Sequence, residues 1–220
     1  MQGYLELLLL RQRELEPAEA HNYLETAVRQ SERVARLVGD LFVLTRLEEE
    51  DAQAHAEAFA AAELAQDVAE KFAADARRRA VTLSTRCGGA GESGGATLVQ
   101  ADIALIERVL DNLVDNALRH TPPGGAVTIE IDRTDGRASM AVSDTGDGIA
   151  ADALAGLFDR YDRATRVGAA GQAGLGLAIA RRIVGLHGSQ LEVRSAPGQG
   201  TRVSFDLALA ALPASRSEPC

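Results

Sequence analysis

Aromatic residues are scarce in this sequence: tryptophan is absent, and aromatic side chains make up only 4% of the chain. Any hydrophobic core must therefore be built mainly from aliphatic side chains. There are only two cysteines, Cys87 and Cys220, which excludes a disulfide framework and favours a reducing compartment. Basic residues are outnumbered by acidic ones, and the formal net charge of −9 argues against a nucleic-acid binder with a basic surface.

Long apolar runs are also missing. The run "LELLLL" near the start contains Glu6 and is far shorter than the ~18 residues that a membrane span needs. It is not a signal peptide either, because Arg11 and Arg13 follow it instead of preceding it. We expect a soluble chain of one or two domains, which can still be the inner part of a larger membrane protein.

Residues 1–49 have the pattern of a helical hairpin. Pro17 and Glu19 suit the first turn of its second helix. The apolar and small residues of that helix follow the heptad steps of a coiled-coil seam: Leu24, Ala27, Ser31, Val34, Val38, Leu41 and Thr45, with Val28, Leu37 and Leu44 beside them. A stripe this broad suits four helices, so we expect a homodimer that completes the bundle. The alternative is a helical layer packed on the second domain of the same chain.

After a polar linker at 50–60, the pattern changes to that of an α+β domain over 61–210, with a disordered tail at 211–220. We expect helices at 61–78, from Asp102 through 120, and at 174–187, and strands at 80–84, 126–132, 138–144, 189–195 and 201–207. Asp135-Gly136 is a hairpin signal between two of the strands. Hairpin strands with segregated helices predict a mostly antiparallel sheet with helices on one face.

The stretch "DNLVDNALRH" places polar side chains beside the apolar face of a helix. At 100° per residue, Asn112, Asn116 and His120 form one ridge at the rim of the core. An amide oxygen there can bind Mg²⁺ without adding negative charge beside a triphosphate. Arg119 and His120 can neutralise phosphate oxygens. The alternative is that both asparagines only bridge buried backbone groups.

Two glycine-rich segments follow. In "SDTGDGI", Asp144 ends a strand and can accept a hydrogen bond from an exocyclic amine, while Gly146 and Gly148 let a flat base approach the backbone. In "GQAGLGLAIARR", Gly174 and Gly176 open a helix whose N-terminus can bind phosphate. The alternatives are an ordinary tight turn and a flexible loop. The segment between them suits a mobile lid, and "PGQGT" indicates a turn between strands.

The order of these segments resembles the sensor histidine kinases of two-component systems. "NLVDNALRH", "DTGDG", "LFDRYDRA", "GLGLAI" and "GQGT" resemble the N, G1, F, G2 and G3 boxes of that family, over about residues 100–207. The same superfamily includes gyrase, the mismatch-repair ATPases and the large heat-shock chaperone. Residues 1–49 resemble part of the family's dimerisation and histidine-phosphotransfer hairpin.

The resemblance implies half of a dimeric four-helix bundle followed by an α/β sandwich of the Bergerat ATP-binding type. It implies an ATP-dependent protein-histidine kinase that uses Mg²⁺ and passes a phosphoryl group from a histidine to a response regulator's receiver aspartate. It also implies a homodimer in the cytoplasm, as part of a membrane-bound sensor, with no nucleic-acid partner.

The same resemblance assigns roles to particular residues. Asn112 and Asn116 are implied as catalytic and metal-binding residues. The implied ATP-binding residues are Asn112, Asn116, Arg119, His120, Asp144, Gly146, Gly148, Ile149, Phe158, Tyr161, Arg163, Gly174, Leu175, Gly176, Leu177 and Thr201. Gyrase-type ATPases carry a water-activating glutamate at the position of Asn112, and an amide cannot serve as a general base. We therefore expect slow hydrolysis and transfer to a histidine instead.

The phosphoacceptor departs from the family pattern. The family's acceptor lies in a sequence like S-H-E-L-R-T-P-L, and this chain begins just after where that sequence should stand. Neither His21, His55, His120 nor His187 has that context; His187 lies at a helix end, where a cation suits the dipole. We expect a truncated chain that binds ATP without an autophosphorylation site. The alternatives are a non-catalytic dimerisation scaffold and an anti-sigma-type serine kinase, although the heptad hairpin argues against the latter.

Overall fold

The computed structural model describes residues 19, 22–28, 30–31, 38–39, 54–88, 97–134, 136–155 and 175–210. The chain divides into two compact units, Met1–Glu50 and Asp51–Cys220, and each is considered by itself. The predicted tail at 211–220 lies outside the described residues.

In the first unit, the described residues of the predicted second helix are helical. Ala27 is buried, whereas Leu24, Val28 and Val38 are about half exposed, at 50%, 55% and 49%. Apolar side chains in the seam of a helix bundle are partly exposed when one chain is considered without its partner, and these side chains fit that description. Seam positions such as Val34 and Leu41 lie outside the described residues.

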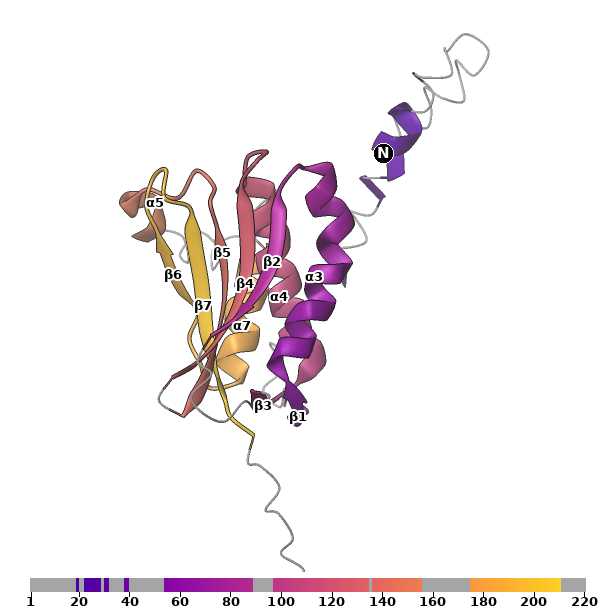
Figure 1. Ribbon diagram of the computed structural model, residues 1–220. Helices are drawn as coiled ribbons and strands as arrows, with labels where there is room; N and C mark the ends of the chain where they lie inside the picture. Colours follow the sequence, from indigo (N-terminus) through magenta and orange to yellow (C-terminus); the bar gives the residue numbers. More distant parts are fainter. Residues whose placement is uncertain are drawn as a thin grey trace, which may run out of the picture. The chain divides into compact units, whose positions relative to one another are not determined.

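The second unit contains a five-stranded sheet with the strand order β2-β4-β5-β7-β6 (Figure 1). Its strands are β2 (Thr82–Cys87), β4 (Ala126–Thr134), β5 (Arg137–Asp144), β6 (Glu192–Ser195) and β7 (Thr201–Ala208). β2 pairs with β4 in parallel, and the other neighbours are antiparallel. A second, two-stranded sheet pairs β1 (Glu57–Ala60) with β3 (Leu98–Ala101).

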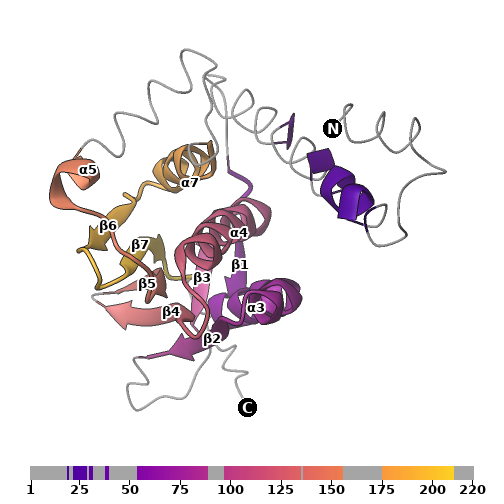
Figure 2. The same ribbon diagram turned by 90° about the horizontal axis from the view of Figure 1, so that it is seen from above.

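Three long helices cover one face of the five-stranded sheet (Figure 2). They are α3 (Ala61–Arg78), α4 (Ile103–His120) and α7 (Leu175–Leu186), and a short helix, α5 (Ala151–Ala155), lies near β6. The core between the helices and the sheet is aliphatic apart from one aromatic ring: its largest fully buried side chains include Phe205, Ile106, Leu110, Leu118, Ile129, Ile131, Met140, Ile179 and Ile183. The α+β fold with helices on one face of a mostly antiparallel sheet is thus confirmed.

The boundaries differ from the sequence prediction in several places; among them, the strand expected from residue 189 begins only at Glu192. Glu57–Ala60, expected in the linker, form β1, and its partner β3 was not anticipated. Both strands are four residues long and partly alanine, so they carry little β-propensity of their own. The strand expected from Ala80 begins at Thr82 instead, because Ala80 adopts the left-handed conformation (φ 55°) in the turn that ends α3.

A lysine connects α3 to α4. Lys71 Nζ lies 2.9 Å from Glu107 Oε1 and 2.6 Å from Asp111 Oδ2. Burial raises the pKa of Asp111, although the Lys71 ammonium opposes that rise. Because the pKa of Asp111 is raised in the folded protein, ionising this carboxyl lowers the free energy of unfolding as the pH rises through that pKa. The Lys71 ammonium reduces this loss of stability at neutral pH.

We expect Lys71→Met to lower the free energy of unfolding by about 1 kcal/mol at pH 7, because half-buried Asp111 loses its counter-ion. Urea unfolding followed by circular dichroism measures the change. Adding Asp111→Asn should recover part of the loss, whereas Asp67→Asn on exposed α3 surface should have little effect. An unchanged midpoint in Lys71→Met would show that this ion pair does not stabilise the contact between the helices.

Candidate functional site

Helix α4 places the predicted ridge at the rim of the core. It begins at Asp102, whose side chain accepts a hydrogen bond from Leu105 N (3.1 Å) as an N-cap. The predicted apolar face is buried: Ile106, Val109, Leu110, Leu113 and Ala117. Asn112 and Asn116 are consequently half-buried, and His120 at the helix end is exposed.

Asn112 lies against the start of α7. A Cβ placed on Gly176 would come within 3.0 Å of Asn112 Oδ1, so glycine allows α7 to approach this close. Asn112 Nδ2 is buried and has no hydrogen-bond partner within the described part of the chain. A buried donor is normally paired. An amide in this position suits a ligand with oxygen atoms, since its NH₂ group can donate a hydrogen bond to them.

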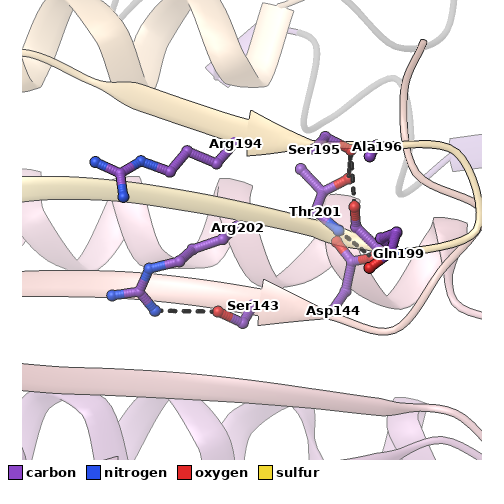
Figure 3. A pocket seen from close by; sticks show the side chains of 9 residues that line it. Ser143, Asp144, Arg194, Ser195, Ala196, Gln199, Thr201 and Arg202 are labelled. Atoms are coloured by element: carbon purple, nitrogen blue, oxygen red, sulfur yellow. Dashed lines mark hydrogen bonds between the residues drawn. The ribbon is translucent and has the colours of Figure 1, made fainter. Parts of the chain in front are cut away.

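Asp144 ends β5 with one oxygen fixed by the backbone. Its Oδ1 accepts a hydrogen bond from Gly146 N (2.8 Å). It accepts a second one from Thr201 N (3.2 Å) (Figure 3). Both bonds use the same oxygen, which leaves Oδ2 as the atom that can accept from a ligand. Burial raises the pKa of Asp144, while the two N–H groups and His120 oppose that rise.

The glycines of the "DTGDG" segment allow close backbone packing. A Cβ on Gly146 would lie 2.3 Å from the carbonyl oxygen of His120, at the end of α4. A Cβ on Gly148, which has a φ of +70°, would lie 1.9 Å from the carbonyl oxygen of Ala196. The segment thus packs between α4 and the β6–β7 turn. This packing alone explains why glycine is needed at both positions, without a contact to a bound base. Their predicted contact with a base stays a prediction.

α4 brings the predicted constellations together. The Asn112 side chain contacts Gly176 of the third segment, and the carbonyl oxygen of His120, two turns further along the helix, contacts Gly146 of the second. Other predicted residues are nearby: Ile149 is half-buried in the same loop as Gly148, Leu177 is half-buried on α7, and Leu175 begins that helix. Phe158, Tyr161, Arg163 and Gly174 lie outside the described residues.

Arg119 has a neighbour that the sequence analysis did not consider. Its guanidinium forms an ion pair with Asp115, one turn earlier on α4. Such i,i+4 pairs are common on exposed helix surfaces. A phosphate contact by Arg119 would therefore compete with Asp115, and that contact remains a prediction.

His187 has a hydrogen bond at each ring nitrogen. Its Nδ1 lies 2.8 Å from Ile183 O, and its Nε2 accepts from Asp102 N (3.1 Å). His187 thereby joins the end of α7 to the N-cap of α4. A histidine with both nitrogens engaged is a structural residue, as the sequence context indicated; His21 lies outside the described residues.

A pocket of about 330 Å³ opens where β5, β6 and β7 end (Figure 3). Its lining residues are Ser143, Asp144, Arg194, Ser195, Ala196, Gln199, Gly200, Thr201 and Arg202. Ser195 was missed by the sequence analysis. Its hydroxyl accepts from Ile149 N and donates to Gly200 O, both at 2.8 Å. The available signal was a hydroxyl residue two positions before the "PGQGT" turn, on the same strand face as Val193.

Among the described residues, no group of three or more His, Cys, Asp or Glu side chains can hold a metal ion. The oxygen donors at the site are the amides of Asn112 and Asn116. Mg²⁺ accepts few protein ligands when phosphates and water supply the rest. The donor set therefore fits Mg²⁺ held together with a polyphosphate, and does not fit a metal bound by protein alone.

Comparisons with known proteins identify the family of this chain. Residues 101–211 match the family model "Histidine kinase-, DNA gyrase B-, and HSP90-like ATPase", and residues 1–50 match "His Kinase A (phospho-acceptor) domain". The chain belongs to this ATPase family, and the order of its two regions is that of a sensor histidine kinase.

Individual relatives span nearly the whole chain. The sensor histidine kinase RppB of Synechocystis sp. is 32% identical over 89% of this chain and 42% of its own length. A structure of the Acinetobacter baumannii histidine kinase AdeS has a TM-score of 0.72 at 20% identity, covering 96% of this chain and 93% of that one. Full-length ShkA in complex with AMPPNP has a TM-score of 0.70 at 27% identity, covering 93% and 42%.

The chain spans less than half the length of the curated relatives it matches first. Within the described residues, no helix is both long and apolar enough to cross a membrane.

Proposed function

We propose that this chain is the ATP-binding catalytic region of a two-component sensor histidine kinase. It binds ATP with Mg²⁺ and transfers the γ-phosphoryl group to a histidine, from which a response regulator's receiver aspartate takes it. The observation that carries the proposal is the position of α4: the Asn112 side chain lies against Gly176 and the carbonyl oxygen of His120 lies against Gly146, so one helix adjoins both glycine segments.

The two ends of this part of α4 suit the two ends of a nucleotide. Near Gly146, the free oxygen of Asp144 is placed to accept a hydrogen bond from the exocyclic amine of adenine. Near Gly176, the N-terminus of α7 and the buried amide of Asn112 suit phosphate oxygens. Asn116 lies one helical turn from Asn112 and supplies an amide oxygen for the metal. Bound Mg²⁺ would neutralise charge on the phosphates.

The absence of a carboxylate at position 112 determines the reaction. An amide at pH 7 cannot remove a proton from water, so the site holds the triphosphate without activating a hydrolytic attack. A histidine imidazole is a better nucleophile. Its nitrogen attacks the γ-phosphorus in line, the bond from that phosphorus to the β–γ bridging oxygen breaks, the bond's electrons leave with ADP, and the imidazole loses a proton to solvent.

The first unit indicates how the chain would assemble. The half-exposed Leu24, Val28 and Val38 support a homodimer in which two hairpins complete a four-helix bundle. Such a bundle is the surface from which a receiver domain would collect the phosphoryl group. We place the chain in the cytoplasm, where ATP and the receiver domain are available, as part of a membrane-bound sensor.

Phosphoryl transfer to a supplied acceptor tests the reaction. The purified chain is incubated with γ-labelled ATP, Mg²⁺ and a separate helical hairpin that contains S-H-E-L-R-T-P-L. We expect label on the hairpin that acid removes and alkali does not, as for phosphohistidine. Acid-stable label would indicate a serine kinase, and rapid release of free phosphate would indicate a hydrolase; either result contradicts the proposal. A hairpin with glutamine in place of the histidine is the control.

A further inference from the structure

Ser195 is the last residue of β6, and its hydroxyl forms as many hydrogen bonds as a hydroxyl can. It accepts from Ile149 N (2.8 Å). It donates its proton to Gly200 O (2.8 Å), and Thr201 Oγ1 lies 2.9 Å away as a second donor (Figure 3). Ile149 belongs to the loop that follows Asp144, whereas Gly200 belongs to the β6–β7 turn and Thr201 begins β7. One hydroxyl therefore joins two segments that are about fifty residues apart in sequence.

The same two segments meet backbone to backbone. Gly198 N donates to Asp147 O at 2.7 Å. A Cβ on Gly148 would come within 1.9 Å of the carbonyl oxygen of Ala196, and one on Gly200 within 1.9 Å of that of Asp144. Because no side chain fits at Gly148 or Gly200, the two segments have little room to shift relative to each other. The hydrogen bonds of Ser195 further fix their relative position.

Asp144 depends on this register. Its Oδ1 accepts one hydrogen bond from each side: Gly146 N of the loop, and Thr201 N, which follows the turn directly as the first residue of β7. The plane of the carboxylate, and hence the direction of Oδ2, follows from where these two amides lie. If the loop and the turn moved apart, Oδ1 would keep at most one bond, and the carboxylate could rotate.

We propose that Ser195 is a positioning residue that determines base specificity, because it holds the loop and the turn at the spacing that orients Asp144. The inference rests on the proposed ATP site. With Ser195 in place, the carboxylate presents an acceptor to a purine with an exocyclic amine at position 6 and rejects a purine with a carbonyl there. Without it, the carboxylate rotates, and this discrimination weakens.

The test compares Ser195→Ala with Ser189→Ala. Ser189 Oγ also accepts a backbone N–H bond, from Asp206 N at 3.1 Å, next to the far end of the same hairpin. Calorimetric titration of each protein with ATP and with GTP, in Mg²⁺, gives the ratio of the two dissociation constants. We expect Ser195→Ala to lower the preference for ATP roughly tenfold, and Ser189→Ala to change it less than about twofold.

A purely structural role would reduce the affinity for both nucleotides equally and leave the ratio unchanged, and that result would overturn the inference. Should Ser195→Ala not fold, Ser195→Cys keeps the size with weaker hydrogen bonding, and the same loss of preference is expected from it. Faster amide exchange at Gly146 and Thr201 in the variant would support the positioning role; unchanged exchange would contradict it. If the wild type binds neither nucleotide, the proposed function itself is wrong.

Discussion

Replacing Asp144 with asparagine is expected to lower the affinity for ATP by roughly 10- to 100-fold and to raise the affinity for GTP relative to ATP. The reason is the pair of backbone donors on Oδ1. Gly146 N and Thr201 N both need an acceptor, so the amide oxygen of asparagine must take the place of Oδ1. The amide nitrogen then stands where Oδ2 stood, and it faces the base as a donor.

A donor there meets the amine of adenine unfavourably and the carbonyl oxygen of guanine favourably. Titration with ATP and GTP in Mg²⁺ measures both affinities, and the Ser189→Ala protein serves as the control with a changed side chain outside the site. If Asp144→Asn keeps the wild-type preference for ATP, Asp144 does not read the base.

Asp144 also predicts a pH dependence. Only the ionised carboxylate accepts from the base on Oδ2, and burial raises its pKa above the ordinary value of about 4. ATP affinity should thus be complete above the raised pKa and should fall as the pH drops through it. Titrations over a series of buffers from neutral to acidic pH measure this step, which should be missing in Asp144→Asn. A wild-type affinity that does not change in this range would contradict the assignment.

Asn116→Ala is expected to reduce the affinity for Mg²⁺-ATP on the order of 100-fold, a size typical of changes around a bound metal. The amide oxygen of Asn116 is the donor that we assign to Mg²⁺, and alanine leaves that position to water. Because the residue is half-buried at the rim of the core, the truncation should change the stability of α4 only modestly. Calorimetry with ATP in Mg²⁺ measures the loss.

Removing the metal separates this role from a general structural one. In EDTA, the wild type and Asn116→Ala should bind ATP with the same weak affinity, because the side chain acts through the metal. Glu107→Gln, a change at a half-buried position on the same helix, is the matched control and should bind Mg²⁺-ATP normally. Tight Mg²⁺-ATP binding by Asn116→Ala would remove this residue as a ligand, whatever the control shows.

Much of the fold could be predicted because local sequence patterns indicate its main helices and strands. α3 lies over the predicted residues Ala61–Arg78, and β4 and β5 form the hairpin that Asp135-Gly136 indicated. β1 and β3 could not be predicted in this way. Their stability comes from pairing across some forty residues, and four-residue strands carry no periodic signal strong enough to show it.

The site divides in a similar manner. The ridge of Asn112, Asn116 and His120 follows from helix periodicity, so the sequence was sufficient to expect it. The role of the glycines as points of backbone contact was not predictable, because Gly148 meets Ala196 only after two distant segments have folded together. The hydrogen bond that His187 accepts likewise comes from Asp102, 85 residues away in sequence.

The central claim is that the α4 asparagines and Asp144 hold the two ends of one nucleotide. A crystal structure of the chain with Mg²⁺ and a non-hydrolysable ATP analogue tests it most directly. The account predicts the adenine amine within hydrogen-bonding distance of Asp144 Oδ2, the Asn116 amide oxygen on the metal, and the phosphates between Asn112 and the start of α7. A nucleotide bound elsewhere, for instance against Arg194 and Arg202 with these side chains left free, would contradict it.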